Sequence, residues 1–229
     1  KNFKNIYEFE IKTIKTTGDV YKNDRLDRIG GKGLFLKEIE EYILNDQVDI
    51  GIHSMKDVPA VEVNKNLEII CWVKRTYKND ALISNSGKGF FDLPSGAVLG
   101  TSSIRRRAQI LNLRKDLNIK LLRGNVDTRI NKLRKGQFDA IILSLAGIKK
   151  LNLDDQITEV LDLEYFLPAA CQGAVGVQAK INSKFRKLFD DINDLKTEIE
   201  CISERNILNI IGASCNSPVS VEANIDKEE

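Results

Sequence analysis

The chain has 229 residues, of which 42% are hydrophobic and 30% are charged, and its formal net charge is +2. This composition is that of an ordinary globular chain of one or two domains. No stretch approaches the ~18 consecutive apolar residues of a membrane span, and the first ten residues lack the apolar core of a signal peptide. We therefore expect a protein of the cytoplasm, or of an organelle if a presequence has been removed, without a membrane partner.

The cysteines and the single histidine do not follow a metal-binding pattern. The cysteines stand at 71, 171, 201 and 215 without a CxxC pair, and His53 has no acid or nucleophile beside it that would make it catalytic. We expect no metal site and a structural role for His53. Cys71 and Cys201 fall within apolar strand and helix patterns and are expected in the core, whereas Cys215 follows small and turn-forming residues and is expected to be exposed.

The first part of the chain predicts strands and one helix, separated by polar loops. Apolar alternation or continuous apolar runs predict strands at 9–13, 48–52 and 67–73, and helical spacing predicts a helix at 34–44. The turn at 30–33 places Lys32 among glycines without the P-loop pattern, which indicates a mobile loop carrying a useful cation. Residues 74–80 form a polar connector of the length expected for a crossing between domains.

From Ala81 the alternation of strands and helices starts again. Strands are predicted at 81–84, 97–100, 119–122 and 139–144, with helices at 103–115 and 128–135. This alternation implies a parallel sheet with right-handed crossovers, separate from the first unit and facing it across a cleft. Residues 168–176 are too small and glycine-rich for a helix and are expected to carry the chain back to the first unit. Two amphipathic helices, at 185–195 and 197–211, follow.

Two loops of the second unit have the composition of an anion-binding site. Thr101, Ser102 and Ser103 precede a helix that carries Arg105 and Arg106, and Arg123 and Arg129 flank a second turn. A helix start offers unpaired N–H groups, and arginine offers two-pronged donors for carboxylate or phosphate. Between 101 and 135 there are eleven Lys or Arg and two acids. A capped helix with a solvated basic face explains either loop alone, but the two together favour ligand binding.

The first unit adds polar residues at the end of its second predicted strand. Ser54, Lys56 and Asp57 follow the strand at 48–52, and ligands of open α/β sheets collect at such carboxyl ends. An aspartate two residues before a proline is also a common turn former. From the residues alone, both interpretations of Asp57 stay open.

Seven segments, in the same order and across almost the whole chain, resemble the porphobilinogen deaminase family. They are GGKGLF at 30–35, HSMKDVP at 53–59, GTSSIRR at 100–106, LRGNVDTR at 122–129, DAIIL at 139–143, QGAVG at 172–176 and the Cys215 loop. The resemblance implies an α/β fold with two periplasmic-binding-protein-like domains around a cleft and a small α+β third domain, here truncated. The implied boundaries are 1–73 with 174–191 for domain 1, 79–167 for domain 2 and 195–229 for part of domain 3.

The resemblance also implies an activity and a cofactor. The family condenses four porphobilinogen molecules head to tail into hydroxymethylbilane and releases ammonia, a step of tetrapyrrole and haem biosynthesis. A dipyrromethane cofactor, attached by a thioether to Cys215, primes the chain, and Asp57 is the implied catalytic carboxylate. The implied substrate- and cofactor-binding residues are Ser54, Lys56, Thr101, Ser102, Ser103, Arg105, Arg106, Arg123, Arg129, Lys32, Lys150, Gln172 and Gly173. At Lys150 the family has arginine, so a point charge replaces a two-pronged donor.

The main alternative is a non-catalytic anion-binding protein of the same two-domain architecture, which fold alone does not exclude. It predicts no pyrrole on Cys215 and no special need for Asp57. Nucleic-acid binding is disfavoured, because the net charge is near neutral and no aromatic platform accompanies the basic segment. The resemblance indicates a monomer that acts on a small molecule.

Overall fold

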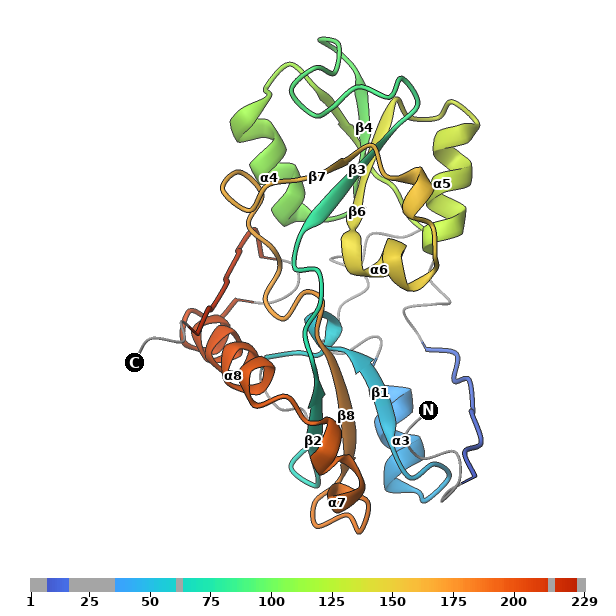
Figure 1. Cartoon of the computed structure of the whole chain (residues 1–229), viewed down its shortest axis with the longest axis vertical. Coiled ribbons are helices and arrows are strands. Elements are labelled where there is room, and N and C mark those ends of the chain that lie inside the picture. The colour runs from blue at the N-terminus through green and yellow to red at the C-terminus, as the bar shows by residue number, and fades with distance from the viewer. Residues whose placement is uncertain (1–7, 17–35, 61–63, 214–216, 226–229) are drawn as a thin grey trace.

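The computed structural model describes residues 8–16, 36–60, 64–213 and 217–225 (Figure 1). These residues form two sheets, one of three strands and one of five. Figure 1 shows the five-stranded sheet in the upper half of the molecule and the three-stranded sheet in the lower half, with helix α8 beside the lower sheet. The predictions for Lys32, the turn at 30–33 and Cys215 lie outside the described residues.

The lower sheet has the order β1-β8-β2, and both pairings are antiparallel. Its strands are β1 (Gly51–Ser54), β2 (Leu67–Val73) and β8 (Val175–Lys180). Helix α3 (Lys37–Leu44) packs against β1 and β8, and η1 (Met55–Asp57) follows β1 directly. Because β8 lies between β1 and β2, the prediction that the chain returns to the first unit is confirmed.

The upper sheet has the order β5-β4-β6-β3-β7. Its strands are β3 (Asp80–Ser84), β4 (Val98–Gly100), β5 (Asn118–Lys120), β6 (Ala140–Ser144) and β7 (Glu159–Val160). Strand β4 is parallel to β5 and β6, whereas β3 is antiparallel to β6 and β7. The predicted parallel sheet is therefore wrong for β3, and β7 was not predicted. A helix follows β4 and β5 and reverses the chain, but the connection from β3 to β4 contains no helix.

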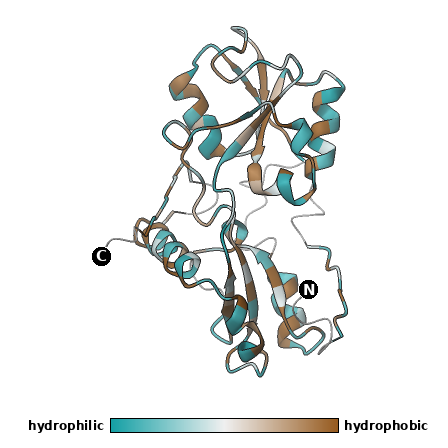
Figure 2. Ribbon diagram, viewed as in Figure 1, coloured by the Kyte–Doolittle hydropathy of each residue, from teal (hydrophilic) through white to brown (hydrophobic). Residues whose placement is uncertain are grey.

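Three helices accompany the strands of the upper sheet: α4 (Ile104–Leu113), α5 (Val126–Arg134) and α6 (Leu145–Lys150), followed by η2 (Asp154–Gln156). Two buried clusters line its strands, one containing Leu82, Leu99 and Ile110, the other Ile83 and Ile141 with their neighbours. Figure 2 shows these strands as predominantly hydrophobic and the helices as two-sided. Burial of these apolar side chains is the main contribution that holds the sheet and helices together.

Two further predictions from the sequence do not match the structure. Residues 8–16 contain no regular element, so the strand predicted at 9–13 is wrong, and Ile11 is 91% exposed. The predicted helix at 185–195 is broken into α7 (Arg186–Phe189) and η3 (Asp190–Ile192). The helical segment ends before Asn193, whose Oδ1 accepts the Trp72 N–H of β2 at 2.7 Å.

Helix α8 (Leu195–Ile210) follows, close to its predicted range. Asp194 begins it by accepting the Thr197 N–H at 2.8 Å, as an N-cap aspartate does. Cys71 and Cys201 are both fully buried, which confirms their prediction as core thiols. Among the helices of the described residues, none combines the length and apolarity needed to cross a membrane.

Candidate functional site

Two segments, which we call the crossing segments, join the sheets: residues 74–79 lead from β2 to β3, and 167–174 lead back to β8. They touch at Gly173, whose φ is +88°. A Cβ atom there would lie 2.0 Å from the Thr76 carbonyl oxygen, so only glycine fits without moving the backbone. Gly173, a predicted binding residue, therefore stands where the two crossing segments meet.

Gln172 is also buried in this crossing. It is 1% exposed, and its amide Nε2 donates to the carbonyl oxygens of Lys78 and Asn79 at 2.7 and 3.2 Å. The same group donates to Asp80 Oδ1 at 2.8 Å. The structure thus gives this predicted binding residue three partners in and beside the other crossing segment.

Asp80, at the start of β3, connects the crossing to helix α4. It is fully buried and accepts from Arg106 Nε and NH2 at 3.0 and 2.7 Å, and from Arg105 NH2 at 2.8 Å. Both arginines are buried, at 5% and 6% exposure. Their charges and hydrogen bonds hold the pKa of Asp80 well below its ordinary value although burial alone would raise it.

The hydroxyl groups at the start of α4 are used locally. Ser103 Oγ accepts the Arg106 N–H at 3.3 Å, which makes Ser103 the N-cap, and Thr101 Oγ1 accepts the Ser103 N–H at 3.1 Å. Ser102 lies half-buried between them. The capping interpretation of Ser103 is therefore confirmed.

A second basic turn leads into α5. Gly124, with φ +116°, precedes the helix, and a Cβ atom there would lie 2.7 Å from Thr128 Cγ2. Arg129 folds back over this turn and donates from Nε to the Gly124 carbonyl oxygen at 2.6 Å. The half-buried Arg123 accepts through its own carbonyl oxygen from Lys132 Nζ at 3.0 Å.

Electrostatic interactions connect this turn with α4 and with the end of β1. Burial, together with the positive charges of Arg106 and Arg123, lowers the pKa of Arg129 to about 10, while the Asp57 carboxylate opposes this shift. Burial also lowers the pKa of Lys56, which the Asp57 carboxylate raises and Arg106 lowers again. We call these five residues the basic cluster: the cations Lys56, Arg106, Arg123 and Arg129 and the exposed carboxylate of Asp57, on segments that follow strands of both sheets.

Two predicted residues have less specific surroundings. Ser54 ends β1 and is exposed, one residue before η1. Lys150 ends α6 and is also exposed. Neither has a hydrogen bond that ties it to the basic cluster within the described part of the chain, so their assignment stays a prediction.

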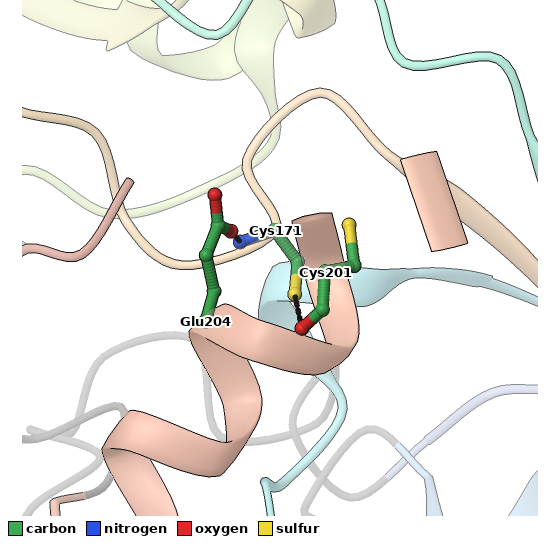
Figure 3. Close-up of side chains that lie close together, drawn as sticks. All are labelled: Cys171, Cys201 and Glu204. Carbon is green, nitrogen blue, oxygen red and sulfur yellow. Dashed lines mark hydrogen bonds between the residues drawn. The ribbon is translucent and has the colours of Figure 1, made fainter. Parts of the chain in front are cut away.

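A group of three buried residues escaped the sequence analysis: Cys171, Cys201 and Glu204 bring a sulfur or carboxylate atom each within 4.8 Å of the others (Figure 3). Cys171 lies in the returning crossing segment with φ +58°, and its N–H donates to Glu204 Oε2 at 2.5 Å. Its Sγ donates to the Cys201 carbonyl oxygen at 3.6 Å. The thiols come from residues 30 positions apart, so no spacing in the sequence indicated the group.

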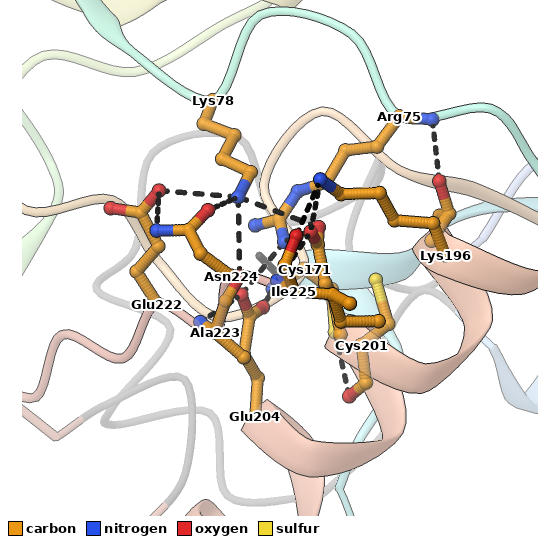
Figure 4. Close-up of polar contacts among 12 residues, drawn as sticks. Arg75, Lys78, Cys171, Lys196, Cys201, Glu204, Glu222, Ala223, Asn224 and Ile225 are labelled. Carbon is orange, nitrogen blue, oxygen red and sulfur yellow. Dashed lines mark hydrogen bonds and ion pairs between the residues drawn. The ribbon is translucent and has the colours of Figure 1, made fainter. Parts of the chain in front are cut away.

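The carboxylate of this group is already paired with arginine. Arg75 NH1 lies 2.7 Å from Glu204 Oε1, which also accepts the Ala223 N–H at 2.9 Å. Arg75 Nε donates to the Gln172 carbonyl oxygen at 2.9 Å. Figure 4 shows this network, in which Lys78 joins α8 and the segment after it. The neighbouring guanidinium would repel a metal cation, so the group is better suited to holding α8 on the crossing segments than to metal binding.

Two cavities are lined by residues outside the basic cluster. One of about 410 Å³ is lined by residues of β3, α5 and η2, among them Ser84, Ile130 and Gln156. Another of about 340 Å³ lies between β2 and α8 and is lined by Trp72 and Ile202 among others. Neither contains a residue predicted to bind substrate or cofactor.

Comparison with known proteins gives the family of the chain. Residues 1–187 match the family profile of porphobilinogen deaminase, dipyrromethane cofactor-binding domain. The chain belongs to the porphobilinogen deaminase family. It is 44% identical over 225 residues to the porphobilinogen deaminase of Bacillus thuringiensis subsp. konkukian (strain 97-27), and equally so to that of Bacillus cereus (strain AH820). Each match covers 97% of this chain and 72% of the relative.

Among solved structures, the methionine-binding protein MetQ is similar to 82% of this chain and 82% of its own, with a TM-score of 0.45 and 13% identity. The strands and helices confirm the α/β fold class, and the family profile confirms the dipyrromethane cofactor expected from the sequence. The relatives at 44% identity are porphobilinogen deaminases, enzymes of tetrapyrrole biosynthesis. The activity that the resemblance implied is therefore confirmed as well. The individual site residues and the domain boundaries stay predictions.

Proposed function

We propose that this chain is a hydroxymethylbilane synthase, which joins four porphobilinogen molecules head to tail and releases ammonia from each. The basic cluster carries the proposal. Porphobilinogen bears an acetate and a propionate, so a growing chain brings two carboxylates per ring. Arg106, Arg123, Arg129 and Lys56 offer cationic donors on segments that follow strands of both sheets.

The residues present fit a dipyrromethane. Its carboxylates need donors that are already desolvated, and Arg105 has a buried Nε with no hydrogen-bond partner among the described residues. Burial also lowers the pKa of Arg129 and Lys56, which indicates that both cations lack full hydration and gain from an anionic ligand. When bound through Cys215, the dipyrromethane supplies the free pyrrole carbon that reacts with the first substrate.

Asp57 is the proposed catalytic residue. It is the last residue of η1, directly after Lys56, and it is exposed. Its carboxylate interacts electrostatically with the Arg129 guanidinium. Loss of ammonia from porphobilinogen leaves a methylene-pyrrolenine cation, and a carboxylate beside the pyrrole N–H stabilises that charge. A carboxylate also accepts and returns protons, and we assign the transfer of the pyrrole proton to this group. Lys56 and the arginines hold the substrate carboxylates while this happens.

The proposal extends to the division of the chain. We assign 1–73 with 174–191 to domain 1, 79–167 to domain 2 and 195–229 to part of domain 3. The separate sheets and the two crossing segments support the first two assignments, and α8, held to the crossing by Arg75, supports the third. We also propose that the protein acts as a monomer.

The test is the intact mass of the denatured protein, followed by peptide mapping. Two linked pyrrole units on the Cys215 peptide, absent from a Cys215→Ser variant, support the proposal and give the attachment residue. If the purified chain has no added mass, incubation with porphobilinogen decides. Gain of the two units supports the synthase, whereas a chain that binds porphobilinogen but never gains mass or releases ammonia is the non-catalytic anion-binding protein.

A further inference from the structure

Asp80 is the residue through which the two arginines of α4 are held together. Four donors surround its carboxylate at 2.7–3.0 Å: Arg105 NH2, Arg106 Nε, Arg106 NH2 and Gln172 Nε2. Each oxygen accepts two of them, so the carboxylate has no capacity left for a ligand. Its side chain is fully buried, and its function is therefore exerted on its neighbours and not on the substrate.

The pairing solves an electrostatic problem at the start of α4. Arg105 and Arg106 are buried next to each other at a helix N-terminus, where the helix dipole and mutual repulsion both disfavour positive charge. One carboxylate between them leaves the group with a single net positive charge. It also fixes the guanidinium plane of Arg106, which binds it with two parallel N–H groups, and holds Arg105 through NH2.

The two arginines have further donors that do not contact Asp80, and some of these bind backbone carbonyl oxygens. Arg105 NH1 donates to the Leu167 carbonyl oxygen at 2.6 Å, and Arg106 NH1 donates to the Ile142 carbonyl oxygen at 3.1 Å. Arg105 Nε remains unpaired among the described residues, and Arg106 influences both Arg129 and Lys56 electrostatically. Arg105 Nε is thus a donor that Asp80 and the backbone leave open, and Arg106 connects the pair to the basic cluster.

Gln172 links this arrangement to the crossing segments. Its side-chain Nε2 donates to Asp80 and to two backbone carbonyl oxygens of one crossing segment. Its backbone carbonyl oxygen accepts from Arg75 Nε. Arg75 in turn is paired with Glu204 of α8. A continuous series of contacts therefore runs from α8 through the crossing to the arginines of α4.

We propose that Asp80 is a positioning residue of the reaction, which sets Arg105 and Arg106 for the substrate carboxylates, with Gln172 fixing Asp80 relative to the crossing segments. The proposal rests on the function proposed above. It adds a residue that does not touch the substrate. It also makes the positions of the two arginines depend on the contact between the crossing segments. A purely structural Asp80 predicts lower stability only, whereas a positioning Asp80 predicts weaker substrate binding in folded protein.

The variants are Asp80→Asn, Gln172→Met and the control Asp116→Asn. Asparagine keeps the shape but turns an N–H donor toward the arginines. Methionine removes the Nε2 donor of Gln172 together with its Oε1, which has no hydrogen-bond partner among the described residues. Asp116 is an exposed partner of Arg114 with the same two-pronged geometry, at 2.8 and 2.7 Å, and lies outside the basic cluster. The holoprotein is compared for kcat, KM for porphobilinogen and thermal unfolding, with kinetics taken well below every unfolding midpoint.

For Asp80→Asn we expect KM to rise about tenfold or more, since charge-assisted hydrogen bonds to the substrate are lost or misdirected. For Gln172→Met we expect a rise of about threefold or more with the fold retained, and this variant decides the matter if Asp80→Asn does not fold. Asp116→Asn leaves KM unchanged. Folded Asp80→Asn with wild-type KM, or folded Gln172→Met with wild-type KM where Asp80→Asn is unfolded, overturns the proposal.

A second readout separates this proposal from the proposed function. The Nε–H signals of isotope-labelled arginines, assigned with Arg105→Lys and Arg106→Lys, report the two guanidinium positions without turnover. Both signals should shift in Gln172→Met and in folded Asp80→Asn, but not in Asp116→Asn. If the wild-type chain makes no product, the proposed function fails, and these signals alone then decide whether Asp80 positions the arginines: unchanged signals overturn it.

Discussion

Replacing Gly173 by alanine tests the contact between the crossing segments directly. The new Cβ would lie 2.0 Å from the Thr76 carbonyl oxygen and 2.9 Å from that of Tyr77, and both obstacles are backbone atoms. Gly173 also has φ +88°, which an alanine adopts only at a cost. The variant should therefore separate the two segments or distort them.

The two costs have different sizes and can be separated. A left-handed backbone costs a non-glycine residue about 1–2 kcal/mol. Displacing packed backbone by the amount needed here adds about 1–3 kcal/mol. Together they amount to about 2–5 kcal/mol, which at about 2–4 °C per kcal/mol for a chain of this size lowers the unfolding midpoint by roughly 4–20 °C.

Gly87→Ala is the matched control. Gly87 has a similar φ of +70° but nothing within 4 Å of its would-be Cβ, so alanine there bears only the backbone cost. Both substitutions reduce the entropy of the unfolded chain equally, and that contribution cancels in the comparison. Thermal and denaturant unfolding of the two variants should therefore differ by the packing cost, about 1–3 kcal/mol. Equal stabilities would refute the close approach of the crossing segments.

Three further predictions concern single residues. Arg75→Met leaves the fully buried Glu204 carboxylate without its cation and should cost about 3–5 kcal/mol in denaturant unfolding; a loss below about 1 kcal/mol contradicts the network. Asp57→Asn should keep the fold and the cofactor mass but lower turnover about 100-fold or more, and near-normal turnover of loaded protein rejects its catalytic role. Burial lowers the pKa of His53, so its imidazole stays neutral when folded but takes up a proton when unfolded below pH 6.5. Stability should thus be full above that pH and fall as the pH drops through it, and His53→Gln should lose this part of the pH dependence.

Local patterns in the sequence predicted much of the fold. The apolar run at 67–73 is β2 in full, and the Thr-Ser-Ser start gave α4 with Ser103 as its cap. These predictions succeed because burial periodicity and capping depend on residues near one another in the chain. The strand predicted at 9–13 had the right alternation, but the described residues give it no neighbouring strand to pair with.

The direction of β3 could not be predicted from the local sequence pattern. Apart from Asp80, its residues are mostly apolar like those of β6, and nothing in them indicates that the two strands run antiparallel. Strand direction depends on where the chain enters the sheet, and β3 enters from the other sheet through a crossing segment. The same dependence places β8 beside β1, more than a hundred residues earlier, although its return to that sheet was predicted.

The sequence by itself determined the family, the basic composition of the site and the segments that carry its charges. Only the tertiary structure decided which charged side chains pair with one another inside the protein. In the sequence Asp80 ends a polar connector, but in the structure it binds Arg105 and Arg106, which the sequence indicated only as ligand donors. Side-chain pairing between buried charges depends on distances across the fold, because each ion must find a partner once water is removed. Residue type and spacing determine what a side chain can bind, but the folded structure determines which buried partner it binds.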